Sequence, residues 1–268
     1  MNLLFFGDVI GRVGREGLLK ALPPLKARYK PDFIIVNAEN AAHGKGLTAK
    51  IAEQFWGMGV DVLTMGNHTF DRKDINTIIN DPRILRPENY PAIVPGHGHH
   101  VFKTRAGIPV AVAQVMGRTN MRPIDCPFQA MDKIFPKLST EAKIVFVDMH
   151  AEITAEKAAM GWYLDGRASV VVGSHTHVQT ADERLLPAGT AFITDAGACG
   201  PLNGIIGGEV KPAIERFITG LHVPINVATG DAMICGCVID IDETTGKARS
   251  IERIRELITL PATFPDNG

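Results

Sequence analysis

Residues 2–8 read NLLFFGD, a short apolar run that ends in glycine and aspartate. Five more apolar runs rich in Val, Ile and Phe follow it, at residues 33–37, 60–65, 110–115, 144–149 and 169–172. Continuous apolar runs of this length are typical of strands buried on both faces. The segments between the runs include five predicted helices, at residues 17–27, 49–58, 73–79, 128–135 and 154–164. Thr48 is placed to cap the second of these helices.

The last third of the chain predicts an antiparallel hairpin. Residues 190–194 and 233–242 read as strands, DETTG at 242–246 as a turn, and residues 249–256 as a returning strand. Residues 82–98 contain four prolines and predict a long irregular excursion. We therefore expect one domain over residues 1–268, an α/β fold with a mixed sheet, or two packed sheets, covered by helices.

Composition excludes several classes of protein. The formal net charge of the 268 residues is -1, so the basic stripe of a general nucleic-acid binder is absent. The sequence contains no run of eighteen apolar residues, so it predicts no transmembrane helix. The apolar N-terminus has no basic leader, so it reads as a first strand and not as a signal peptide. We expect a cytoplasmic protein.

The spacing of the four cysteines predicts that they pack in the core and form no zinc site. Cys235 and Cys237 form a C-G-C sequence inside an apolar run, while Cys126 and Cys199 stand alone. A structural zinc site requires further cysteines or histidines at matching spacing, and these are missing. We interpret all four cysteines as small core residues without disulfides.

Polar residues able to bind metals follow five of the predicted strands. They are Asp8, Glu39 with Asn40, Asn67, His150, and His175 with His177. Taken alone, each has an ordinary explanation as a turn, cap or surface residue. Ligand sites of open α/β sheets lie beyond the carboxyl ends of the strands. If these strands are parallel neighbours, all five loops converge on one place.

The residue types indicate a pair of divalent cations. Two carboxylates, amide oxygens and imidazoles without thiolate suit manganese, iron or zinc. Seven ligands exceed the needs of one tetrahedral zinc and fit two ions that share a carboxylate. Two such ions and two carboxylates leave a net charge of about +2, which favours a phosphate ester. Paired metals activate water as hydroxide and hold the attacking and leaving oxygens.

Together these motifs resemble the calcineurin-like metallophosphoesterase superfamily, and within it the bacterial YmdB-like branch of cyclic-nucleotide phosphodiesterases. The pattern G-D-V-x-G-x-x-G-R spans residues 7–15, N-A-E-N residues 37–40, G-N-H-T-x-D residues 66–71, and S-H-T-H residues 174–177. The wider superfamily begins with D-x-H, but here Asp8 is followed by Val9 and Ile10. An amide oxygen from Asn40 in place of that imidazole favours iron or manganese.

The resemblance implies a fold of two mixed sheets flanked by helices, an α/β/β/α sandwich, and a division of the ligands. One metal would take Asp8, Glu39, Asn40 and His177; the other would take Glu39, Asn67, His150 and His175, with Glu39 bridging. His68 would be the general acid that protonates the leaving alkoxide, with an orienting role as the alternative. Asp71 either orients His68 or caps the helix predicted from residue 73.

Two further histidine-containing segments are open to interpretation. The glycine-rich loop around His43 and Lys45 either contacts substrate or is an ordinary loop. His97, His99 and His100 lie in or beside the proline-rich excursion and read as solvated loop histidines.

Other nucleotide and hydrolase motifs are absent. The glycines at 11 and 14 do not form G-x-G-x-x-G, and neither a P-loop nor a G-x-S-x-G sequence occurs. We expect a metal-dependent phosphodiesterase acting on 3′,5′- or 2′,3′-cyclic nucleotides. The alternatives are a regulatory protein that binds nucleotide or phosphate with little turnover, and a phosphomonoesterase. We also expect a homo-oligomer that forms no stable complex with nucleic acid or membrane.

Overall fold

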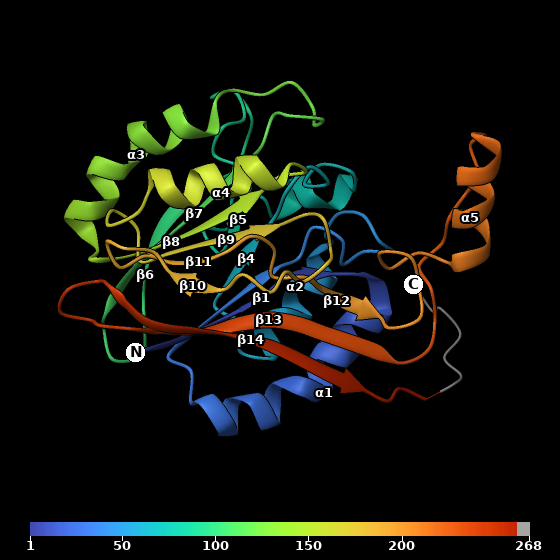
Figure 1. Ribbon diagram of the computed structural model, residues 1–268, viewed down its shortest axis with the longest axis horizontal. Helices are drawn as coiled ribbons and strands as arrows, with labels where there is room; N and C mark the ends of the chain where they lie inside the picture. Colours follow the sequence, from blue (N-terminus) through green and yellow to red (C-terminus); the bar gives the residue numbers. More distant parts are fainter. Residues whose placement is uncertain (262–268) are drawn as a thin grey trace.

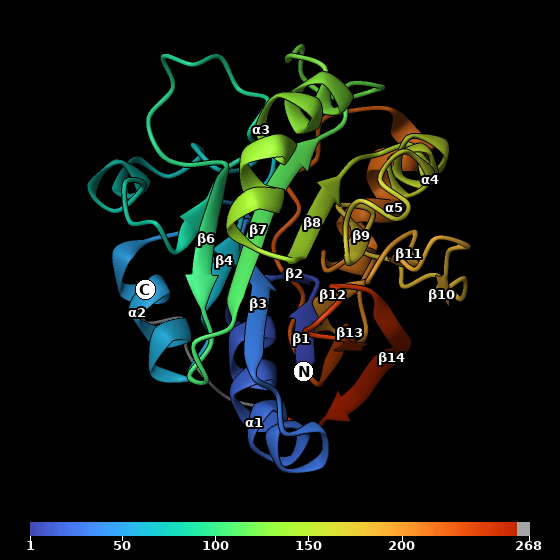
Figure 2. The same cartoon turned by 90° about the vertical axis from the view of Figure 1, so that its left-hand side faces the viewer.

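The apolar runs of the sequence form two mixed β-sheets that lie face to face in the computed structural model, which describes residues 1–261 (Figure 1). Helices cover the outer face of each sheet, so the layers run helix, sheet, sheet, helix (Figure 2). This arrangement confirms the predicted α/β/β/α sandwich.

The first sheet has eight strands in the order β2-β12-β13-β1-β3-β4-β5, with β14 beside β13. Its central strand β1 runs parallel to β3 and antiparallel to β13. The strands are β1 (Asn2–Phe6), β2 (Asp8–Val9), β3 (Phe33–Asn37), β4 (Val62–Thr64), β5 (Ile84–Leu85), β12 (Ala198–Pro201), β13 (Ala232–Ile241) and β14 (Ala248–Ile258). The long pair of β13 and β14 is the predicted antiparallel hairpin.

The second sheet has six strands in the order β10-β11-β9-β8-β7-β6. Its centre is the parallel set β7, β8, β9 and β11, and antiparallel strands close both edges. The strands are β6 (His99–Lys103), β7 (Pro109–Met116), β8 (Ile144–His150), β9 (Val170–Ser174), β10 (Arg184–Leu185) and β11 (Ala191–Ile193).

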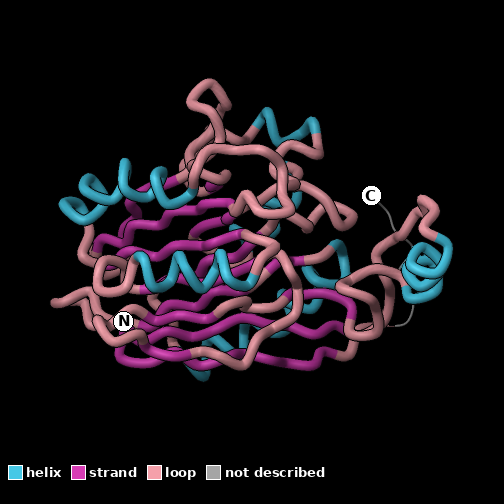
Figure 3. The backbone as a smooth tube through the Cα atoms, turned by 45° about the horizontal axis from the view of Figure 1, so that its top comes forward, coloured by secondary structure: helices cyan, strands magenta, loops and turns pink. Residues whose placement is uncertain are grey.

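Three hydrophobic clusters join the four layers. Alternate residues of β1 and β3 pack with those of β8 and β9 between the sheets. The helices α1 (Gly11–Tyr29) and α2 (Ala49–Gly57) pack on the outside of the first sheet, and α3 (Pro127–Glu141) and α4 (Thr154–Tyr163) on the outside of the second. The helix α5 (Val210–Thr219) stands apart from these layers (Figures 1 and 3).

The structure corrects several predicted elements. The first helix begins at Gly11 and not at residue 17. Within it, a side chain at Gly14 would meet the carbonyl oxygen of Cys199 at 2.2 Å. This glycine lets α1 lie close to β12. The helix predicted at 73–79 is the short 3-10 helix η1 (Lys73–Thr77), and α5 and β6 were not predicted.

Other local predictions are confirmed or refined. The hydroxyl of Thr48 accepts a hydrogen bond from the amide of Ile51 at 3.3 Å and caps α2. Three cysteines are buried, but Cys126 is half-buried and does not belong to the core. Within residues 1–261, no helix is long and apolar enough to cross a membrane.

The contact between Phe5 and Phe146 tests the packing of one sheet on the other. Their rings, from β1 and β8, lie 5.3 Å apart at 41°, and both side chains are fully buried. We expect Phe146→Ala to lower the free energy of unfolding by about 3–5 kcal/mol, because it leaves a cavity between the sheets. The control Ile93→Ala, at a side chain 93% exposed, should change it by less than about 0.5 kcal/mol. Equal effects of the two substitutions in a denaturant titration would contradict this packing.

Candidate metal centre

The predicted ligand residues come from both sheets and meet at one end of the inter-sheet space. Asp8 begins β2, Glu39 follows β3, and Asn67 follows β4 in the first sheet. His150 ends β8, and His175 follows β9, in the second sheet. From the sequence we expected these strands to be neighbours in one sheet, but they belong to two sheets. The loops converge because the two sheets place their carboxyl ends at the same edge of the sandwich.

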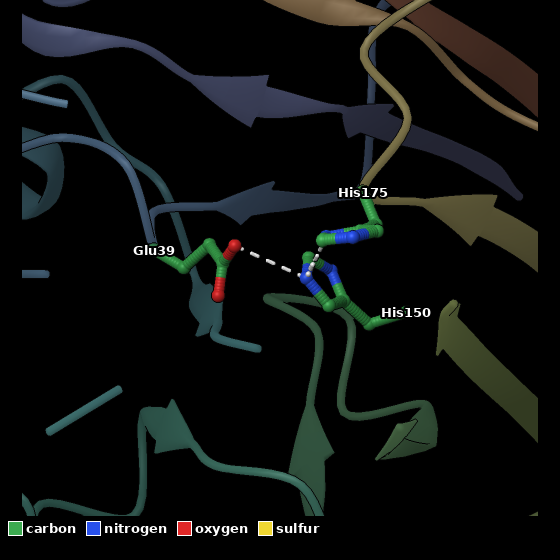
Figure 4. A group of neighbouring side chains, drawn as sticks. All are labelled: Glu39, His150 and His175. Carbon is green, nitrogen blue, oxygen red and sulfur yellow. Dashed lines mark hydrogen bonds and ion pairs between the residues drawn. The ribbon is translucent and has the colours of Figure 1, made fainter. Parts of the chain in front are cut away.

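The imidazole of His150 is the centre of one ligand group (Figure 4). Its Nε2 atom lies 3.0 Å from Asn67 Oδ1, 3.1 Å from Glu39 Oε1 and 3.1 Å from His175 Nδ1. Ligands at right angles around a divalent ion, each about 2.1 Å from it, lie about 3.0 Å from each other. The spacing of these atoms is therefore that of adjacent ligands on one cation.

Three buried oxygens of the predicted ligands accept no hydrogen bond of good geometry. They are Asp8 Oδ1, Asn40 Oδ1 and Glu39 Oε1, and of these Glu39 Oε1 has the imidazole of His150 beside it at 3.1 Å. In each residue another atom is satisfied: Asp8 Oδ2 accepts from the amide of His175, and Glu39 Oε2 accepts from the amide of His68. The amide nitrogen of Asn40 donates to Gly44 O at 2.9 Å. Burying an oxygen without a partner is costly, so three such atoms on three predicted ligands fit the donor set of a metal site.

Each of the three histidines uses one ring nitrogen outside the site. His150 Nδ1 lies 2.9 Å from Ser174 Oγ, and His177 Nδ1 donates to Ile206 O at 3.0 Å. His175 Nε2 lies 3.1 Å from the carboxylate of Glu152. Such partners fix the proton on one nitrogen and leave the other free for a metal.

A buried carboxylate on β8, Asp148, supports the site from behind. It accepts hydrogen bonds from Thr64 Oγ1 at 2.6 Å, Ser174 Oγ at 2.6 Å and Asn37 Nδ2 at 3.1 Å. Ser174 in turn contacts His150, so Asp148 orients a ligand without touching the ligand group itself. Burial raises the pKa of Asp148 to about 6. Sequence reasoning missed this residue, although an acid inside the apolar run IVFVDMH was a usable signal.

The carboxylates of the site favour a positive charge on the adjacent His150. Burial raises the pKa of Asp8, and it would raise that of Glu39, but the adjacent His150 lowers the pKa of Glu39 to about 2. Burial opposes a charge on His150, yet Glu39 and Asp8 raise its pKa to about 9. Burial and the charge of His150 lower the pKa of His175 to about 3. The carboxylates of Glu39 and Asp8 thus favour a positive charge beside them.

Not every predicted ligand is joined to the cluster around His150. Glu39, Asn67, His150 and His175 form that cluster, which matches one of the two predicted ligand sets. In the part of the chain that the structure describes, Asp8, Asn40 and His177 are not hydrogen-bonded to one another. His177 nevertheless interacts with the buried carboxylate of Asp8, because it opposes, without reversing, the rise that burial causes in the pKa of Asp8.

The neighbouring residue His68 is held by a carboxylate. Its Nδ1 lies 2.7 Å from Asp71 Oδ2, and Asp71 Oδ1 is 3.7 Å from the guanidinium of Arg122. Asp71 does not cap η1, whose N-cap is Arg72 without a side-chain hydrogen bond. Of the two roles considered for Asp71, the structure supports the one that orients His68 and leaves its Nε2 free.

A buried ion pair fixes the loop that carries His175 and His177. Lys157 on α4 donates to Asp195 Oδ2 at 2.6 Å, Ser174 O at 2.9 Å and Thr176 Oγ1 at 2.9 Å. The side chains of Lys157 and Asp195 are 1% and 0% exposed. Sequence reasoning missed both residues, because Lys157 is an ordinary residue in a helical pattern until its neighbours are known.

The prediction for His99 was wrong. Its Nδ1 lies 2.9 Å from the carboxylate of Glu88, and it begins β6, so it is not a solvated loop residue.

We expect Lys157→Met to lower the free energy of unfolding by about 3–5 kcal/mol, because it leaves the carboxylate of Asp195 buried without a cation. The matched control is Lys137→Met, where the side chain is 68% exposed and 4.0 Å from Glu141. That change should cost less than about 1 kcal/mol. Denaturant titration of the two variants measures the difference, and a Lys157→Met protein as stable as the control would refute the role of the ion pair.

The chain is similar to several known proteins over nearly its whole length. A 2′,3′-cyclic-nucleotide 2′-phosphodiesterase of Bacillus subtilis is 50% identical over 255 residues, which cover 95% of this chain and 96% of that protein. A solved structure of a hypothetical protein from Thermus thermophilus is 39% identical, with a TM-score of 0.90 over 96% of this chain and 100% of that chain. A solved structure of a novel phosphatase of Mycoplasma pneumoniae is 34% identical, with a TM-score of 0.91 over 97% and 95% of the two chains.

The family model for YmdB-like proteins matches residues 4–254, nearly the whole chain. The fold of this group implies divalent metals, and the cluster of Glu39, His150 and His175 is a candidate place for them. The sequence-based prediction of a phosphoesterase is thereby confirmed at the level of the enzyme class. The chain belongs to the YmdB-like family of metallophosphoesterases.

Proposed function

We propose that this protein is a two-metal phosphodiesterase that hydrolyses small cyclic nucleotides. The observation that carries the proposal is the set of buried oxygens on Asp8, Glu39 and Asn40 that accept no hydrogen bond of good geometry, beside the cluster around His150. Glu39, Asn67, His150 and His175 would hold one cation. Asp8, Asn40 and His177, together with Glu39, would hold a second.

The donor set decides which metals fit. Carboxylate and amide oxygens with imidazole nitrogen suit iron or manganese, and zinc is the third choice. Two divalent cations held here would activate a water molecule and stabilise the charge of the phosphate oxygens. The protein supplies the rest: His150, His175 and His177 each have a partner on one ring nitrogen, and the inter-sheet core behind them is apolar.

His68 is placed to move the proton of the leaving group. In its protonated form, Nδ1–H would donate to Asp71 at 2.7 Å and Nε2–H would be left to donate to substrate. Water, after one of its protons has passed to solvent, would form the new bond to phosphorus as hydroxide while the bond from phosphorus to one ribose oxygen breaks. That oxygen would take the proton from Nε2, and solvent would then reprotonate His68. The product is a nucleoside monophosphate, and the ring of the cyclic ester is open.

The relative from Bacillus subtilis supports the 2′,3′-cyclic ester as the substrate, in preference to the 3′,5′-cyclic ester. A phosphomonoesterase is the second candidate, because a relative of solved structure is described as a phosphatase. Turnover of bis-p-nitrophenyl phosphate against that of the mono-ester separates the two activities.

Self-association and a cytoplasmic location stay predictions. The apolar side of α5 offers a surface for self-association, because Phe217 and Ile218 are 82% and 79% exposed. The apolar residues of segment 201–206 differ in exposure: Pro201 is buried, and Ile206 is 62% exposed.

Removal of the shared carboxylate tests the metal site. We expect Glu39→Gln to lose bound metal and to lose turnover of bis-p-nitrophenyl phosphate in added manganese. The loss should exceed the roughly 10–100-fold that removing a supporting residue costs. The control Glu256→Gln, which removes a surface partner of Arg28, should keep both. Elemental analysis and initial rates measure the effects, and a Glu39→Gln protein with full metal content and activity would overturn the assignment.

The leaving group tests the role of His68. We expect His68→Ala to lower kcat for a 2′,3′-cyclic nucleotide by about 10²–10⁴-fold, because the ribose alkoxide needs a proton to leave. The same variant should lose far less with bis-p-nitrophenyl phosphate, since nitrophenolate leaves without one. Asp71→Asn should show the same selectivity with a smaller loss, about 10–100-fold. Equal losses on both substrates would show that His68 orients the site and is not the acid.

A further inference from the structure

A basic cavity of about 480 Å³ lies beside the proposed catalytic centre. Its charged lining consists of Arg15, Lys50, Arg72 and Lys73 against Asp71 and Asp74. The balance is four positive charges against two negative ones, or +2, in a protein whose whole net charge is -1. Asp71 also contacts His68 at 2.7 Å and lies 3.7 Å from the guanidinium of Arg122, which balances part of its negative charge.

Both walls of the cavity begin at residues of the site. On one side, the loop after Glu39 and Asn40 supplies Ala42 and His43. On the other side, the segment after Asn67 and His68 supplies Asp71, Arg72 and Lys73. Asp71 is shared directly, because its carboxylate lines the cavity and also binds His68 Nδ1 at 2.7 Å. A ligand that reaches His68 therefore has this cavity as its next space.

The cations of the cavity are positioned by the backbone. Arg72 donates to Lys45 O and Ala42 O, each at 3.1 Å, and Arg15 donates to Ala41 O. Carbonyl oxygens satisfy the N–H groups of Arg72 but carry no full negative charge to balance it. Lys50 and Lys73 are exposed at the rim, on the first turn of α2 and at the start of η1.

The N-terminus of α2 adds to the same potential. Its cap Thr48 and the first-turn residues Lys50 and Ile51 line the cavity, and the first turn holds no acidic residue. The N-terminal end of a helix carries a partial positive charge that favours anions. The helix end and the four side chains thus point to one ligand chemistry, a phosphate group.

We propose that this cavity binds a second phosphate of the substrate, so that the preferred substrate is a 2′,3′-cyclic nucleotide with a phosphate on its 5′ oxygen. That phosphate is either a terminal 5′-monophosphate or the phosphodiester to a preceding nucleotide at the end of an RNA strand. This inference rests on the proposed function, and it explains why the loop around His43 and Lys45 lies next to the metal ligands. Lys50 and Lys73 set the preference for the longer substrate.

The test compares three substrates: adenosine 2′,3′-cyclic phosphate, its 5′-phosphorylated form, and the dinucleotide ApA with a 2′,3′-cyclic phosphate end. We expect the wild-type protein to have a kcat/KM at least about tenfold higher for one or both of the longer substrates. The double variant Lys50→Gln, Lys73→Gln should bring this ratio to within about twofold of one. The control double variant Lys30→Gln, Lys103→Gln changes two exposed lysines elsewhere and should keep the ratio.

The test depends on the ratio of kcat/KM between the longer and the shorter substrates, so a loss of activity on all substrates does not change its outcome. A gain with the 5′-phosphorylated nucleotide alone assigns the cavity to a terminal phosphate, and a gain with the dinucleotide assigns it to an RNA end. A wild-type ratio near one for both longer substrates, or a ratio unchanged in Lys50→Gln, Lys73→Gln, overturns the proposal.

A binding measurement separates this inference from the proposed function. Adenosine 3′,5′-bisphosphate should bind at least about tenfold more tightly than adenosine 3′-monophosphate, and the double variant should lose the difference. Calorimetry measures this without turnover. Selective binding with no hydrolysis of any cyclic nucleotide would contradict the proposed function and support the cavity assignment. Hydrolysis of a cyclic nucleotide without selective binding would support the proposed function and contradict the cavity assignment.

Discussion

The structure depends on one constraint: buried oxygens of Asp8, Asn40 and Glu39 at the edge of two packed sheets accept no hydrogen bond of good geometry, and only that of Glu39 has an imidazole, His150, beside it at 3.1 Å. Water does not reach these atoms, and the cost of leaving them unpaired falls on the folded state. Glu39 and Asp8 raise the pKa of the buried His150 to about 9, so the carboxylates of the site favour a positive charge beside them. A site with this donor set and this surplus of negative charge is built for cations.

The rest of the fold serves to hold that edge rigid. The inter-sheet core fixes β1, β3, β8 and β9, whose carboxyl ends carry the ligands. Behind the ligands, Asp148 and the ion pair of Lys157 with Asp195 tie the loop of His175 to both sheets and to α4. These supporting groups lie in regular elements or buried loops, so the ligand geometry does not depend on a mobile segment.

The sequence predicted the parts that local pattern determines. Buried strands such as residues 2–6 and 33–37 read directly as apolar runs, and their boundaries match. The candidate ligand residues could be named from the sequence, because each stands at or shortly after the end of such a run. Their division between two facing sheets was beyond local pattern, since strand pairing is a long-range property. The partnership of Lys157 with Asp195, 38 positions later, was hidden for the same reason.

The most direct test is a crystal structure of the metal-replete protein with anomalous data collected at the absorption edge of the bound metal. The account predicts two anomalous peaks in the site. One should lie among Glu39, Asn67, His150 and His175, and the other should contact the free oxygens of Asp8 and Asn40. A single peak, or peaks that leave the oxygens of Asp8 and Asn40 without a cation, would contradict it.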